Sequence, residues 1–156
     1  TFQRCPMKEL ISSLSRQYTE NLISHRRYLH AHPEPSFKEF NTRDYIASVL
    51  KKAGLEPRTF DEACAVVCPI KGSRPGKRIA FRADMDALCM QEENDLAACP
   101  YRSQTDGVMH ACGHDGHVAV LLTLGPQRTP GAYRRRDSVP VSARRGDPSR
   151  RSSLPY

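Results

Sequence analysis

The run from His110 to His117 carries the highest density of side chains in this chain that could bind a metal. Within eight residues it holds three histidines, one cysteine and one aspartate: His110, Cys112, His114, Asp115 and His117. Each is a residue type found in or beside zinc, manganese and nickel sites. An exposed histidine-rich loop that binds nothing would have the same composition. The position of the run between a polar loop and an apolar helix, where functional residues tend to gather, favours the metal site.

Two aspartates form a second candidate group. Asp84 and Asp86 follow a short apolar run, and alternate residues of an extended segment point the same way. Both carboxylates could then face one cavity, or hold the second nitrogen of a histidine ligand. An aspartate pair after a strand is more often part of a turn. This pair therefore indicates a functional site only in combination with the histidine run.

Two helices are expected before these residues. Apolar side chains recur at steps of three and four over residues 7–31, which is typical of one helix face, and the prolines from Pro33 onward end the pattern. A second such stripe runs from Phe37 to Leu50. Ser36 is its expected N-cap, with Glu39 three residues on, and Gly54 is the expected residue after its end.

Strands are expected at residues 63–70 and 77–81, joined by a turn-rich spacer, and a buried helix at residues 118–124. Cys64 and Cys68 would share one face of the first strand, as two small core residues. Helices, then strands, then a helix predict an α/β fold in which helices pack on a mixed β-sheet. No apolar run approaches the length of a membrane span.

The positive charge of the chain lies at its end. The chain carries a formal net charge of +7, and eight arginines against two aspartates place +6 of it in residues 125–156. This segment also holds five prolines and few apolar residues, so we expect a disordered tail. Its composition is also typical of GC-rich coding sequence read in a wrong frame, and we hypothesise a shifted frame or a misjoined exon near Leu124.

Four segments together resemble peptidase family M20: Arg26–Glu34 (RRYLHAHPE), Arg82–Leu88 (RADMDAL), Gln91–Asn94 (QEEN) and Val108–His117 (VMHACGHDGH). The branch that they resemble contains hippurate hydrolases, N-acyl-amino-acid deacylases and plant auxin-conjugate hydrolases. The likeness extends over residues 7–124. It implies that residues 1–124 are the N-terminal part of a zinc-peptidase-like catalytic domain without its lid domain, followed by the tail at 125–156.

The resemblance also implies an activity and a set of site residues. Members of this branch hydrolyse the amide bond of small N-acyl amino acids with two divalent ions, whose identity here is open among Mn, Zn, Ni and Co. Cys112 and His114 match metal ligands. Asp86 matches the catalytic-site aspartate that orients a ligand, and Asp84 falls where other branches carry a histidine ligand. His117 is expected to be structural or to support a ligand.

The family's general-base glutamate and later ligands are not among these residues, so we expect no hydrolysis from this polypeptide alone. The resemblance implies no membrane or nucleic-acid partner, and dimerisation only through the lid domain. The alternative is a nucleic-acid or acidic-surface binding protein that uses its basic tail and retains a vestigial hydrolase domain. The six irregularly spaced cysteines do not indicate a disulfide scaffold, which favours a reducing compartment and hence the cytoplasm.

Overall fold

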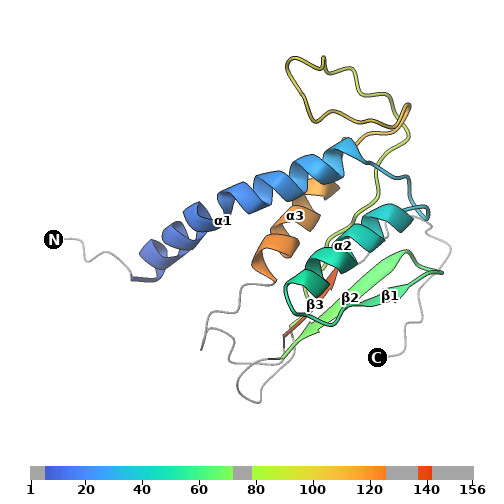
Figure 1. The fold of residues 1–156 in the computed structure, drawn as a ribbon. Coiled ribbons are helices and arrows are strands. Elements are labelled where there is room, and N and C mark those ends of the chain that lie inside the picture. The colour runs from blue at the N-terminus through green and yellow to red at the C-terminus, as the bar shows by residue number, and fades with distance from the viewer. Residues whose placement is uncertain (1–5, 72–78, 126–136, 142–156) are drawn as a thin grey trace.

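The computed structural model describes residues 6–71, 79–125 and 137–141. These residues form three helices and three strands: α1 (Pro6–Ala31), α2 (Phe40–Lys52), β1 (Arg58–Phe60), β2 (Ala65–Ile70), α3 (His114–Leu124) and β3 (Asp137–Val141). The strands make one sheet in the order β1-β2-β3. Helix α2 packs on this sheet, α1 packs against α3, and a long loop between β2 and α3 passes the C-terminal end of α1 (Figure 1).

The predicted α/β arrangement of helices on a sheet is confirmed, with one difference in the sheet. Both strand pairs are antiparallel, whereas a mixed sheet was expected. A connection of only four residues joins β1 to β2, and so short a connection requires antiparallel pairing. In the described residues, parallel pairing outside the sheet is limited to a single bridge between Pro35 and Ala87.

Helix α1 is fully buried only at its C-terminal end, and its middle is half-buried. Leu29 is 2% exposed, whereas Met7, Leu10 and Ile11 near the other end are at least half exposed. Figure 1 shows this N-terminal half extending past the other elements. The helix ends at Ala31, as the sequence predicts. The last turns of α1 are therefore the part that positions side chains against the rest of the fold.

Helix α2 begins later than predicted and ends where predicted. The expectation that Ser36 caps it is wrong, because Phe37 adopts a positive φ of 68° and the helix starts only at Phe40. At the other end Gly54 has a φ of 75°, and its N–H donates to the carbonyl of Lys51. This left-handed glycine is the expected helix stop.

The strand predictions are confirmed in part. Residues 63–70 were expected to be extended, and β2 covers 65–70. Cys64 precedes the strand with a φ of 44°, so Cys64 and Cys68 do not share a strand face, although both are buried. Of the strand predicted at 77–81, residues 79–81 are described and form no strand beyond an isolated bridge position at Ala80.

Helix α3 begins at His114, four residues before the predicted start, so the histidine run enters its first turn. Its apolar residues complete a core that joins α1, α2 and β2. The core consists of twelve side chains: Leu29, Ile46, Leu50, Leu55, Cys64, Val66, Cys68, Ile70, Ala83, Met85, Val118 and Leu122. Burying each large member contributes roughly 1.5–3 kcal/mol. This core fixes α3, and with it the first residues of the helix.

The predicted tail at 125–156 is described only in part. Strand β3 lies within it and pairs with β2, and the remaining residues from 126 onward are outside the described residues, so disorder there stays a prediction. In the described chain, no helix combines the length and the apolar character needed to cross a membrane.

Candidate metal centre

His114 is held by Asp86, the aspartate that the family resemblance assigns to orienting a ligand. Its ring is buried at the first position of α3, and its Nδ1 lies 3.0 Å from Oδ1 of Asp86 and 2.9 Å from the carbonyl oxygen of the same residue. Both partners are acceptors, so Nδ1 carries the proton and donates it. The unprotonated Nε2 on the other side of the ring can then bind an ion, as in carboxylate–histidine–metal arrangements.

Cys112 lies two residues before His114, and its side chain is exposed. Gly113 between them has a φ of 82° and is the N-cap of α3. A thiol and an imidazole nitrogen with a fixed tautomer suit borderline and soft divalent ions such as zinc. In the described part of the chain, these two residues do not join a third histidine, cysteine or carboxylate in a group of close ligand atoms. They supply two donors of a site.

The two aspartates of the second candidate group separate. Asp86 contacts His114, whereas Asp84 accepts hydrogen bonds from Arg82 at 2.6 and 3.0 Å. Residues 81–86 lie outside any strand, which removes the alternation that would have turned both carboxylates the same way. Asp86 therefore joins the candidate centre and Asp84 belongs to a local ion pair.

A buried ion-pair network lies behind the histidine run. Asp115, 1% exposed, accepts a 2.7 Å hydrogen bond from Nδ1 of His30 and lies 3.0 Å from Nε of Arg26. The hydrogen bond from His30 acts against burial and leaves the pKa of Asp115 below its usual value, and the same bond raises the pKa of His30. Helix α1 is thereby tied to the first turn of α3.

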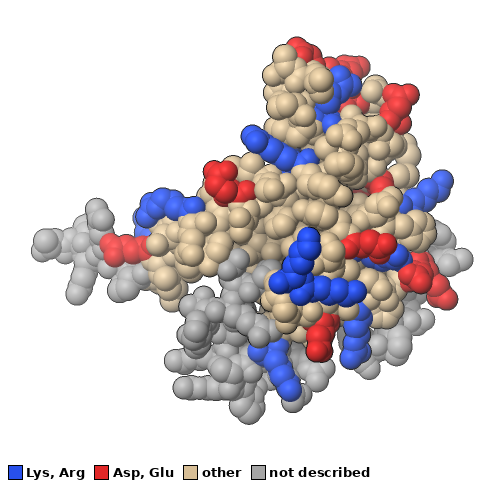
Figure 2. All heavy atoms as spheres, viewed as in Figure 1, with Lys and Arg blue, Asp and Glu red and all other residues tan. Residues whose placement is uncertain are grey.

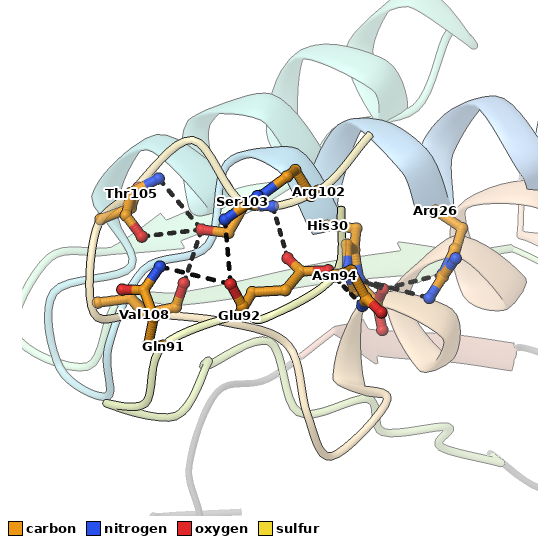
Figure 3. A network of polar contacts seen from close by, with 10 residues as sticks. Arg26, His30, Gln91, Glu92, Asn94, Arg102, Ser103, Thr105 and Val108 are labelled. Carbon is orange, nitrogen blue, oxygen red and sulfur yellow. Dashed lines mark hydrogen bonds and ion pairs between the residues drawn. The ribbon is translucent and has the colours of Figure 1, made fainter. Parts of the chain in front are cut away.

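Glu92 extends this network into the long loop. Its Oε1 lies 3.3 Å from Nε2 of His30 and accepts a 2.8 Å bond from Asn94, and its Oε2 accepts a 2.6 Å bond from the N–H of Ser103. Burial alone would raise the pKa of Glu92, but these donors together lower it. Figure 3 shows Glu92 between the loop residues and His30.

His110 is buried and has no hydrogen-bond partner on either ring nitrogen. Burial lowers its pKa to about 4, and the charged groups that act on it include Asp115, Asp86 and His30. It therefore lies among the side chains of the centre as a neutral imidazole. A buried polar ring without partners is uncommon and marks a place where an ion, a water or a ligand group would be accommodated.

The remaining three histidines are less buried than those of the centre. His117 is exposed, with its ring 6.0 Å from that of His114. His25 lies 2.8 Å from the hydroxyl of Tyr45, and His32 donates to the backbone of α1. The role of His117 stays a prediction.

Sequence reasoning missed the three residues that build the buried network. His30 and Glu92 were seen only as parts of motif segments, and Asp115 was grouped with the histidines without a partner. Each contact spans at least 62 residues of sequence, and no spacing rule reaches that far. The available signal was their shared presence in the four motif segments.

Comparisons with known proteins identify the class. The model of peptidase family M20/M25/M40 matches residues 80–125. Thermostable carboxypeptidase 1 of Saccharolobus solfataricus is 48% identical over 108 residues, which cover 69% of this chain and 27% of that protein. The N-acyl-L-amino acid amidohydrolase of Geobacillus stearothermophilus is 44% identical over 115 residues, which cover 74% of this chain and 30% of that protein.

Solved structures agree with this class. The YXEP protein of Bacillus subtilis, described as a dinuclear metal binding peptidase from the M20 family, superposes with a TM-score of 0.71 at 36% identity, covering 81% of this chain and 35% of that chain. A putative aminohydrolase from Staphylococcus aureus superposes with a TM-score of 0.79 at 36% identity. The match covers 90% of this chain and 36% of that chain. The chain belongs to peptidase family M20. It spans between a quarter and a third of the length of the curated relatives described above.

Proposed function

We propose that this chain supplies Cys112 and His114 to the divalent-metal centre of an amidohydrolase that cleaves the amide bond of N-acyl amino acids. The observation that carries the proposal is the contact between His114 and Asp86, with Nδ1 and Oδ1 3.0 Å apart in a buried setting. Asp86 is a positioning residue: it holds the ring in the tautomer that can bind an ion.

The relatives support this choice of chemistry. One is named an N-acyl-L-amino acid amidohydrolase and another is described as a dinuclear metal binding peptidase. A bound divalent ion, of the Mn, Zn, Ni or Co type, would acidify a coordinated water and polarise the amide carbonyl. The side chains of this chain would hold the ion, while His110 stays neutral beside it. The activity of a whole protein of this family is part of the proposal.

The alternative of a nucleic-acid binding protein finds no support in the described residues. Figure 2 shows acidic and basic side chains interspersed over the face in view, without a continuous basic surface. The arginine-rich segment lies almost entirely outside the described residues. We further propose a cytoplasmic location, because the described cysteines are all unpaired.

Metal content measured on the full chain tests the proposal. The Cys112→Ala/His114→Ala variant is compared with the wild type and with a Cys89→Ala/His32→Ala control, which removes the same residue types from exposed positions. After loading with Zn²⁺ and gel filtration, the control and the wild type should retain equal zinc. The first variant should retain about one equivalent less. Equal zinc in all three would refute ligation by Cys112 and His114.

A further inference from the structure

We propose that His30, Glu92 and Cys99 form a second binding site for a thiophilic divalent ion such as Zn²⁺, separate from Cys112 and His114. One ligand atom from each of the three side chains lies within 4.8 Å of the other two, and all three residues are buried. Around a tetrahedral zinc ion, donor atoms stand roughly 3.3–3.8 Å apart, as follows from metal–ligand distances of about 2.0–2.3 Å. Small side-chain movements would close the group around an ion.

His30 is already oriented for this role. Its Nδ1 lies 2.7 Å from Oδ2 of Asp115, which leaves Nε2 directed at the Glu92 carboxylate. The Nε2 to Oε1 separation of 3.3 Å is long for a charged hydrogen bond and close to the spacing of two zinc ligands. The contact with Asp115 repeats the carboxylate–histidine arrangement that supports metal ligands elsewhere.

Donors hold both carboxylate oxygens of Glu92: Ser103 binds Oε2, and Asn94 binds Oε1, the oxygen that also faces His30. The backbone N–H of Ser103 and the side chain of Asn94 both donate to its carboxylate, and Arg102 donates to its carbonyl oxygen. Figure 3 shows Asn94 beside His30 and Ser103 at the other side of Glu92. The carboxylate is therefore fixed before any ion arrives, which lowers the ordering cost of binding.

Cys99 adds a thiol to the imidazole of His30 and the carboxylate of Glu92, and an ion pair between those two residues would not require it. It is 8% exposed and sits in a turn closed by the bond from its N–H to the carbonyl of Asp95. The plain alternative is a histidine–carboxylate pair with the cysteine as a small core residue. Three protein donors leave one coordination position for water, and the ion would tie the long loop to the end of α1.

Cobalt substitution separates the two sites. The Cys112→Ser variant of the 156-residue chain is titrated with Co²⁺ alone, and the thiolate-to-cobalt charge-transfer band is recorded in the near ultraviolet. We expect a band that saturates at one ion per chain. Adding Cys99→Ser should abolish the band, while adding Cys89→Ser, at an exposed cysteine, should leave it unchanged. A band that survives the Cys99→Ser change, or a folded Cys112→Ser protein with no band, would overturn the proposal.

A second measurement needs no folded variant. The wild-type chain is alkylated with and without saturating Zn²⁺, and each cysteine is followed by peptide mapping. Zn²⁺ should slow modification of Cys99 at least tenfold while Cys89 reacts at an unchanged rate. Equal rates at Cys99 with and without Zn²⁺ would refute the site. Protection of Cys112 reports on the proposed function independently, so failure of one proposal is distinguishable from failure of the other.

Discussion

Helix α3 has a buried first turn and a buried face further along, and the chemistry of these two regions is opposite. Its first turn places His114 and Asp115 among charged partners, whereas Val118, Ala119 and Leu122 further along lie in the apolar core. The apolar end is stabilised by burial alone, while each charge at the polar end requires a matching partner. Because buried ion pairs often add little net stability, the polar end is better explained by the geometry that it holds for the candidate centre.

The largest expected effect comes from removing the buried carboxylate at the polar end of α3. Asp115→Ala removes the acceptor of Nδ1 of His30 and the carboxylate partner of Arg26, and leaves both donors beside a cavity. We expect the free energy of unfolding to fall by about 3–5 kcal/mol, measured by urea denaturation. Asp115→Asn keeps the shape and one acceptor and should lose less. If Asp115→Ala lowered the free energy of unfolding by less than about 1 kcal/mol, the charges at the polar end would not require a matching partner.

A substitution in the apolar part of α3 should lower the free energy of unfolding and leave zinc binding unchanged. Leu122→Ala removes a side chain that is 1% exposed and leaves a cavity, which costs about 2–5 kcal/mol. Zinc retained per folded molecule should match the wild type, because no ligand contacts this residue. Val120→Ala, at an exposed position of the same helix, is the control and should change stability little. Loss of zinc in a folded Leu122→Ala protein would show that the two ends are coupled.

Acidification should lower the free energy of unfolding through His110, which lies just before the polar end of α3. Burial lowers its pKa to about 4 from an ordinary value near 6.5, so between these pH values the unfolded chain binds the proton and the folded chain does not. In metal-free protein, the free energy of unfolding should therefore fall as the pH drops through this window, by up to about 3 kcal/mol.

The His110→Gln variant isolates this contribution from that of its neighbour. The raised pKa of His30 acts oppositely, since its stabilisation is complete below about pH 6.5 and is lost as the pH rises through the folded-state pKa. His110→Gln should remove the fall attributed to His110 and leave the contribution of His30. Parallel pH profiles for the variant and the wild type would refute the assignment.

The smallest expected effect sharpens the role of Asp86. Asp86→Ala removes the side-chain acceptor of His114 while its backbone carbonyl remains as a second acceptor. Zinc affinity at the Cys112 and His114 site should fall about 10–100-fold, measured by competition with a chelator. Asp86→Asn retains a side-chain acceptor and should recover part of the loss. Unchanged affinity in Asp86→Ala would remove Asp86 from the centre.

Local sequence patterns predicted which segments are helical more accurately than they predicted the residues at which the elements begin and end. The apolar stripes located α1 and α2, and Gly54 marked the end of α2 because only a left-handed residue fits there. The start of α2 was misplaced because the positive φ of Phe37 displaces the helix start from Ser36, and no propensity predicts that. Strands β1 and β3 escaped prediction because each is short and depends on pairing with β2.

The sequence by itself determined the candidate ligands and the family. Cys112 and His114 stand in a motif whose residue types and spacing are informative without coordinates, because ligand chemistry depends on side-chain type. Only the tertiary structure decided that Asp86 contacts His114 in particular, and that His30, Glu92 and Asp115 share one buried network. Those contacts join α1, the long loop and α3 across distances in sequence that only the packing of the core brings together.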